Sequence, residues 1–144
     1  MPERRTVERA RQAKREGKSP STQAGEFVHE EIEHIREGKH GARSTKQAIA
    51  IGLSKARRAG VDLPPPKNAS EETKEQAERD TQKAKSGKKT SAKRSRASRK
   101  ALKKEGRSAA SKEALSRQAR AAAKKRSAAS RSRSAKKAAK TRKK

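Results

Sequence analysis

The densest cluster of branched aliphatic side chains in this chain lies in residues 41–60, GARSTKQAIAIGLSKARRAG. Ser44 stands three residues before Gln47, which is the spacing of a capping box, so a helix is predicted to begin at Ser44 and to stop at Gly60. Its apolar face consists of Ala48, Ile49, Gly52, Leu53 and Ala56. A glycine inside a helix costs about 1 kcal/mol of helix propensity. We therefore expect the backbone of a neighbouring helix to approach Gly52 closely.

A second amphipathic helix is predicted upstream, over about residues 21–37, with Gly38 as its stop. Its apolar face consists of Ala24, Phe27, Val28, Ile32 and Ile35, and its polar face of Glu26, His29, Glu30, Glu33 and Glu37. We expect the large apolar residues of this face to pack on Ile49 and Leu53 in a helical hairpin. Val61 and Leu63, which precede three prolines, are expected to fold back on the hairpin as an extended strap.

Large apolar side chains are scarce outside this region. Met, Val, Ile, Leu and Phe together number 13 of 144 residues, and nine of them lie between positions 27 and 63. A highly charged chain with so few large apolar residues is expected to be mostly disordered. The predicted fold class is all-α, with a short helical hairpin (about 21–37 and 44–59) and a weak N-terminal helix over residues 3–16. The basic C-terminal tail is predicted to be largely disordered and to become helical on binding.

These patterns divide the chain into four segments. Residues 1–20 form a basic N-terminal segment with a helical pattern, and residues 21–63 form the hairpin module. Residues 64–87 form a Pro-rich linker and a solvated helical spacer. Residues 88–144 form a polycationic, low-complexity tail.

Positive charge is concentrated in the C-terminal part of the chain. Residues 81–144 carry 26 Lys and Arg against two acids, a net charge of +24, whereas residues 1–80 carry 17 against 14, a net of +3. Duplex DNA carries about one negative charge per 1.7 Å, so the tail has enough charge to neutralise on the order of 40 Å of duplex. The one aromatic residue, Phe27, offers no stacking platform for bases. The pattern therefore predicts phosphate contacts with duplex DNA or structured RNA.

The predicted nucleic-acid contacts are lysines and arginines of the tail. They are Lys88, Lys89, Lys93, Arg94, Arg96, Arg99, Lys100, Lys103, Lys104, Arg107, Arg117, Arg120, Lys124, Lys125, Arg126, Arg131, Arg133, Lys136, Lys137, Lys140, Arg142, Lys143 and Lys144. Lys46, Arg57 and Arg58, on the polar face of helix 44–59, are predicted as secondary contacts. Base reading by a helix-turn-helix is disfavoured, because the link over residues 38–43 exceeds the usual three or four residues.

Other chemistries are expected to be absent. The chain has no cysteine, so it has neither a disulfide nor a thiolate zinc site. In HEEIEH, His29 and His34 are five residues apart, whereas a zinc-binding helix needs four. No nucleophile and base can be paired, so no enzyme, metal, cofactor or small-molecule substrate is predicted. There is no apolar run of about 18 residues and no signal-like start, which predicts a cytoplasmic, nucleoid protein without a membrane partner.

The sequence also resembles known proteins in two places. Residues 25–60, with GEFVHE, GKHGARS and KQAIAIGLSKARRAG, resemble a family of small basic bacterial proteins catalogued as a domain of unknown function. The end of the tail, SAKKAAKTRKK, resembles the Lys/Ala/Ser tails of linker histones and of bacterial histone-like or plasmid-stabilisation-type basic proteins. The second resemblance implies DNA compaction or coating.

The sequence therefore predicts a non-enzymatic, nucleoid-associated protein that binds duplex DNA without sequence preference and has a histone-like architectural role. Two alternatives stay open. One is binding of structured RNA or ribosomes by the same phosphate contacts. The other is a protein-interaction adaptor, in which the hairpin binds a protein partner or a second copy of the chain while the tail only localises it.

Overall fold

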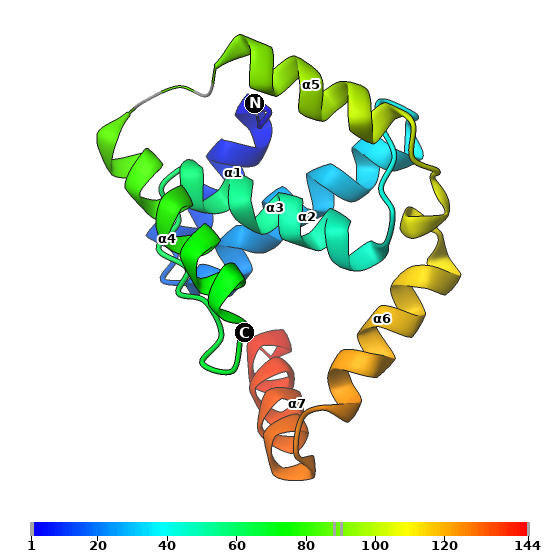
Figure 1. Cartoon of the computed structure of the whole chain (residues 1–144). Coiled ribbons are helices and arrows are strands. Elements are labelled where there is room, and N and C mark those ends of the chain that lie inside the picture. The colour runs from blue at the N-terminus through cyan, green and yellow to red at the C-terminus, as the bar shows by residue number, and fades with distance from the viewer. Residues whose placement is uncertain (1, 88, 90, 144) are drawn as a thin grey trace.

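Two central helices form the predicted hairpin. A computed structural model of the chain describes residues 2–87, 89 and 91–143. Helix α2 (Pro20–Arg36) and helix α3 (Thr45–Arg58) pack against each other in the middle of the molecule (Figure 1). Both begin and end within one residue of the predicted bounds. Ser19 and Ser44 cap their N-termini, as expected for residues that satisfy free backbone N–H groups.

The cap of α3 differs in one detail from a standard capping box. The Ser44 hydroxyl accepts a hydrogen bond from the backbone N–H of Gln47 at 3.2 Å, as predicted. The Gln47 side chain returns to the backbone N–H of Arg43, at 2.6 Å, instead of to that of Ser44. The cap therefore also fixes the residue that leads into the helix.

Gly52 lies where α2 and α3 cross. A Cβ atom placed on Gly52 would lie 2.6 Å from the Cα of Val28 and 2.9 Å from its backbone N. Backbone atoms cannot move aside as a flexible side chain can, so only glycine fits here. The close approach predicted from the sequence is confirmed, and its partner is Val28.

The core consists of two clusters, one toward each end of the hairpin. The cluster near the α2–α3 link contains Ile32, Ile35, Ala42, Ala48, Ala109 and Ala110, with Leu115 packed against it. The other contains Ala10, Ala24, Phe27, Ala56 and Val61, with Val7, Leu53 and Leu63 packed against it. Among the described residues, nine of the 13 buried hydrophobic residues are alanines. The core is therefore built mainly from small side chains.

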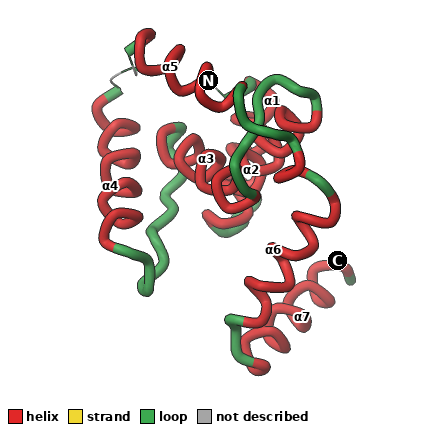
Figure 2. The backbone as a smooth tube through the Cα atoms, turned by 45° about the vertical axis from the view of Figure 1, so that its right-hand side comes forward, coloured by secondary structure: helices red, strands yellow, loops and turns green. Residues whose placement is uncertain are grey.

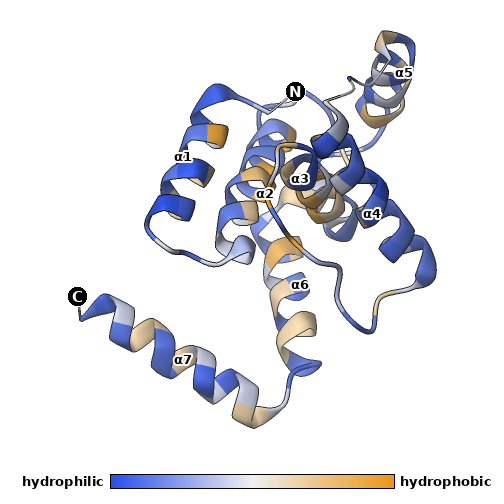
Figure 3. Cartoon of the chain, turned by 90° about the vertical axis from the view of Figure 1, so that its left-hand side faces the viewer, coloured by the Kyte–Doolittle hydropathy of each residue, from blue (hydrophilic) through white to orange (hydrophobic). Residues whose placement is uncertain are grey.

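Two outer helices cover the hairpin. Helix α1 (Arg4–Arg15) packs on α2, and helix α4 (Glu71–Ser86) packs on α3; both are mostly hydrophilic in Figure 3, whereas hydrophobic residues gather at α2 and α3. Because α1 lies on the polar face of α2, Glu30 is only 5% exposed. The polar face of α2 is thus partly covered by α1.

The strap after α3 folds back as predicted. Val61 is buried, and Leu63 packs against the same cluster as Phe27. The Arg57 guanidinium holds this strap, since its Nε donates a hydrogen bond to the carbonyl of Leu63 at 2.8 Å. Arg57 is consequently 7% exposed. The prediction of an exposed Arg57 is therefore wrong.

The C-terminal part of the chain is helical, which overturns the predicted short hairpin with a disordered tail. It contains α5 (Ala92–Lys103), the 3₁₀ helix η1 (Ser108–Ala110), α6 (Lys112–Lys124) and α7 (Ala128–Arg142). Helix α6 leads away from the hairpin and α7 turns back at its far end (Figures 1 and 2).

One physical reason for this difference is that the tail docks on the hairpin through small residues. Ala109 and Ala110 of η1 are buried in the same cluster as Ile32 and Ile35. The Thr45 hydroxyl donates a hydrogen bond to the carbonyl of Ala109 at 2.6 Å.

The end of α5 and the link from α5 to η1 add two backbone hydrogen bonds to this docking. The backbone N–H of Gly41 donates to the carbonyl of Leu102 at 2.9 Å, and that of Ala42 donates to the carbonyl of Gly106 at 3.0 Å. A count of large apolar residues cannot detect contacts of this kind.

A second reason is that serines cap the three α-helices of the tail. The hydroxyls of Ser91, Ser111 and Ser127 accept hydrogen bonds from the backbone N–H groups three residues later, in α5, α6 and α7. Such a cap stabilises a helix by about 1 kcal/mol, and the alanines, lysines and arginines that follow have high helix propensity.

Within the described parts of the chain, no helix is long and apolar enough to cross a membrane.

Candidate nucleic-acid interface

The tail helices carry their basic residues in stripes. In α5, Lys93, Arg96, Lys100 and Lys103 follow one another at intervals of three or four residues, so they share one face. The same spacing joins Arg117, Arg120 and Lys124 in α6, and Arg133, Lys137 and Lys140 in α7, where Lys136 stands next to Lys137. All these side chains are exposed. Each helix thus presents a row of positive charge to solvent.

The described cations of the tail lack acidic partners. Among the described residues, the ion pairs all involve positions before 81, and none includes a Lys or Arg from 89–143. Like charges three or four residues apart on a helix repel each other. Polyanion phosphates placed along these rows would relieve the repulsion.

The structure distributes the predicted contact residues over helices and links. Lys89 precedes α5; Lys104 and Arg107 lie between α5 and η1; Lys125 and Arg126 lie between α6 and α7; Lys143 follows α7. The remaining ones lie within the three helices: Lys93, Arg94, Arg96, Arg99, Lys100, Lys103, Arg117, Arg120, Lys124, Arg131, Arg133, Lys136, Lys137, Lys140 and Arg142. Lys88 and Lys144 lie outside the described residues.

Arg126 is held by the start of α7. Its guanidinium donates hydrogen bonds to the carbonyl and hydroxyl of Ser130 at 3.0 Å, and also to the hydroxyl of Ser134. These contacts fix the turn between α6 and α7. Arg126 is therefore a structural residue of the turn as well as a cation.

The secondary contacts predicted on α3 are mostly used inside the fold. Arg57 is buried, and burial lowers the pKa of its guanidinium, with an opposing effect from the charge of Asp80; an arginine stays charged all the same. Arg58 donates from Nε to the fully buried Asp80 at 2.8 Å, which joins α3 to α4. Lys46 is exposed. Of the three, Lys46 alone has the exposed side chain that a phosphate contact requires.

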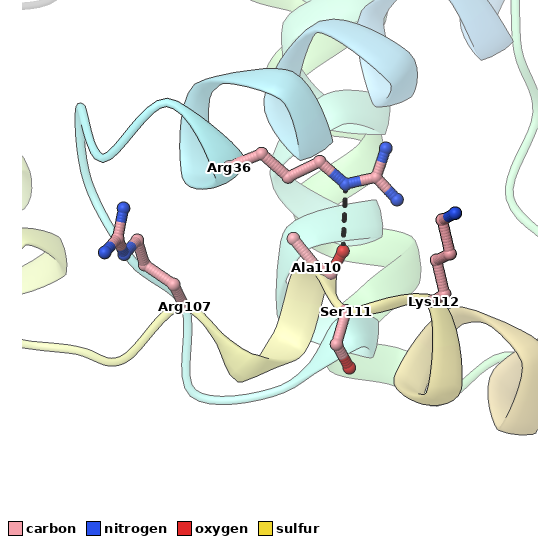
Figure 4. A pocket seen from close by; sticks show the side chains of 5 residues that line it. All are labelled: Arg36, Arg107, Ala110, Ser111 and Lys112. Atoms are coloured by element: carbon pink, nitrogen blue, oxygen red, sulfur yellow. Dashed lines mark hydrogen bonds between the residues drawn. The ribbon is translucent and has the colours of Figure 1, made fainter.

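An open cavity of about 440 Å³ lies where the tail meets the hairpin (Figure 4). It is lined by Arg36, Arg107, Ala110, Ser111 and Lys112. Arg36 donates from Nε to the carbonyl of Ala110 at 3.0 Å. The Arg36 guanidinium and the Lys112 amine both lie at the right of Figure 4. Arg36 pairs with Glu33 at 3.4 Å, whereas Arg107 and Lys112 pair with no described acid.

This cavity could hold an anion such as a phosphate, because three cations surround it at the N-terminus of α6. The sequence analysis missed Arg36 and Lys112 as candidate contacts. Lys112 was detectable, since it lies in the basic tail next to the serine that caps α6. Arg36 was not, because its position beside η1 depends on the docking of the tail.

The described residues that could hold a metal ion lie elsewhere. Glu3, Glu30 and His34 bring three ligand atoms together between α1 and α2, and Glu31, His34 and His40 do so between α2 and the link to α3. No sequence motif placed these residues together.

Part of the chain matches a known protein family. Residues 11–68 match a family of unknown function, DUF6496. The match spans the end of α1, the hairpin and the strap, and it ends before α4. No curated protein and no solved structure matches the chain. The matched family is one of unknown function, as the resemblance of residues 25–60 implied, and it says nothing about the tail helices.

Proposed function

We propose that this chain is a non-enzymatic protein that binds duplex DNA through phosphate contacts, without sequence preference. The observation that carries the proposal is that the described lysines and arginines of the tail are exposed and have no acidic partner. The hairpin and its outer helices pair many of their charges internally, so they act as a scaffold. The tail helices present the charge.

The arrangement favours phosphate contact over base recognition. The basic rows of α5, α6 and α7 consist of long, flexible side chains on solvent-exposed helices, which suits contact with a backbone of regular charge. The cavity at Arg36, Arg107 and Lys112 supplies one fixed phosphate position at the edge of the scaffold. The proposed role in a cell is architectural, in the compaction or coating of DNA in the nucleoid.

The test is a salt titration of DNA binding by fluorescence anisotropy. The slope of log Kd against log salt concentration falls by about 0.9 for each phosphate contact that is lost. A variant with Lys93, Arg96, Lys100 and Lys103 replaced by Gln should therefore lower the slope by about 3 to 4. A matched control replaces Arg4, Arg11, Lys14 and Arg15 of α1 by Gln, which removes the same charge from exposed residues of the scaffold.

The control should change the slope by less than half as much. Equal effects of the two variants would mean that binding reflects net charge alone and would refute the proposed interface. A structured RNA hairpin serves as competitor in the same assay. If it binds more than tenfold tighter than the DNA duplex at equal salt, RNA is the partner and the DNA proposal fails.

A further inference from the structure

One carboxylate in the scaffold is buried with an oxygen that has no partner. The Glu30 side chain, in α2, is 4% exposed. Its Oε1 accepts a hydrogen bond from the backbone N–H of Glu3 at 2.7 Å. Its Oε2 is buried and has no hydrogen-bond partner among the described residues. A buried charge without a partner is costly, so this atom points to a missing ligand.

His34 lies one helical turn after Glu30 and faces the same space. Its Nε2 is 3.2 Å from Oε1 of Glu3 and 3.6 Å from Oε1 of Glu30. The three ligand atoms lie within 4.8 Å of one another. A cavity of about 140 Å³ between α1 and α2 is lined by these residues. The fold therefore joins two carboxylates and one imidazole from two elements.

The distances suit a small tetrahedral ion. Zn²⁺ binds nitrogen and oxygen ligands at about 2.0–2.2 Å, so neighbouring ligands in a tetrahedron lie about 3.3–3.6 Å apart. The separations from Nε2 of His34 to Oε1 of Glu3 and to Oε1 of Glu30 fall close to this range. The unpartnered Oε2 is the second oxygen of the same Glu30 carboxylate. Three protein ligands would leave a fourth position for water.

The other nitrogen of His34 lies on the side of a buried carboxylate, although too far from it for a direct hydrogen bond. Its Nδ1 is 3.8 Å from Oε1 of Glu31, whose side chain is fully buried. Glu31 is held in turn by Nε2 of His40 at 3.1 Å and by the amine of Lys55. Zinc-bound histidines commonly direct their second nitrogen at a carboxylate, which orients the ring and fixes its tautomer.

Charges around the cavity also favour a cation. Its lining includes five glutamates, at positions 3, 26, 30, 33 and 37, against Arg5 and Arg9. The hydrogen bond from His34 lowers the pKa of the Glu3 carboxyl, and the nearby Lys39 adds to this effect. Lys39 pairs with Glu3 at 3.5 Å and with Glu37 at 3.2 Å, and its side chain is half exposed.

From this geometry we infer that Glu3, Glu30 and His34 form a binding site for a divalent transition-metal ion, with Zn²⁺ as the best fit. The ion would neutralise the buried Glu30 and would tie the start of α1 to α2. This site is separate from the basic tail, so it does not depend on the proposed DNA binding.

The test is calorimetric titration of the untagged full-length chain with Zn²⁺ after treatment with a chelator. One ion should bind per chain and should raise the unfolding temperature, because a ligand of the folded state stabilises it. Glu30→Gln keeps an acceptor for the backbone of Glu3 but removes the charge, and it should weaken binding at least tenfold. Glu3→Gln, at a half-exposed position that can change without loss of the fold, should do the same.

The matched control is His29→Gln, because His29 lines the same cavity but is 64% exposed at its side chain and lies outside the three ligands. This variant should bind Zn²⁺ as the parent does. Replacement by Co²⁺ should give the strong visible absorption of a tetrahedral site. Absence of saturable binding, or an equal loss in His29→Gln and Glu3→Gln, would overturn the proposal.

Discussion

Gly52 of α3 lies against the backbone of Val28 in α2, with no space for a side chain between them. The two central helices can approach this closely only because position 52 carries hydrogen in place of Cβ. The contact sets the spacing of the hairpin, against which both core clusters are built.

Replacement of Gly52 by Ala should therefore destabilise the fold. Alanine improves helix propensity by about 1 kcal/mol, but forcing apart two backbones costs about 3 kcal/mol or more, as in overpacked cores. We expect a net loss of about 2 kcal/mol in the free energy of unfolding, measured by urea denaturation. Gly25→Ala is the control, since Gly25 lies inside α2 with nothing within 4 Å of its Cβ position. It should stabilise the chain by about 0.5–1 kcal/mol. A gain from both variants would contradict the close crossing.

Glu31 and Lys55 should be energetically coupled. The Glu31 carboxylate is fully buried and is paired with the Lys55 amine and with His40. Replacing Lys55 by Met leaves a buried charge with one weaker partner, which should cost about 2–3 kcal/mol. The double variant with Glu31→Gln should recover at least 1 kcal/mol of this loss in a double-mutant cycle of denaturant unfolding. A coupling energy near zero would mean that the pair does not form.

The docking of η1 can be tested by proteolysis. Ala109 is 5% exposed, so Ala109→Asp would bury a charge against Ile32 and Ile35 and should release η1. Cleavage by trypsin after Arg107 should become at least about tenfold faster, because the rate follows the population of the open state. Ala138→Asp in the exposed part of α7 makes the same charge change and should leave this rate unaltered. Equal rates in both variants would show that the tail is not docked.

The hairpin was predictable because its signals are local. The Ser44 cap, the glycine stops and the helical spacing of Phe27, Ile32 and Leu53 each lie within one element or its neighbour. The crossing at Gly52 was predictable for a related reason, since a glycine on an apolar face needs a compensating contact. Its partner, Val28, was not predictable. The sequence of one helix does not determine how that helix is rotated relative to its neighbour.

The tail was mispredicted because disorder was inferred from the scarcity of large apolar residues. Ala109, Ala110 and their contacts with Ile32 and Thr45 depend on close backbone approach, which alanine permits and a hydrophobicity count undervalues. The candidate metal site was missed for a different reason. The zinc motif requires two histidines four residues apart on one helix, and His29 and His34 are five apart. The structure instead combines His34 with Glu30 of the same helix and with Glu3, which precedes α1.

The alanine-rich core has a consequence for the response of this protein to temperature. The heat capacity of unfolding rises with the apolar surface that unfolding exposes, and alanine exposes far less of it than leucine or phenylalanine. Nine of the 13 buried hydrophobic residues described are alanines. The free energy of unfolding should therefore follow a flatter curve against temperature than that of a leucine-rich domain of equal length. Cold should weaken this fold less than it weakens a fold held by large side chains.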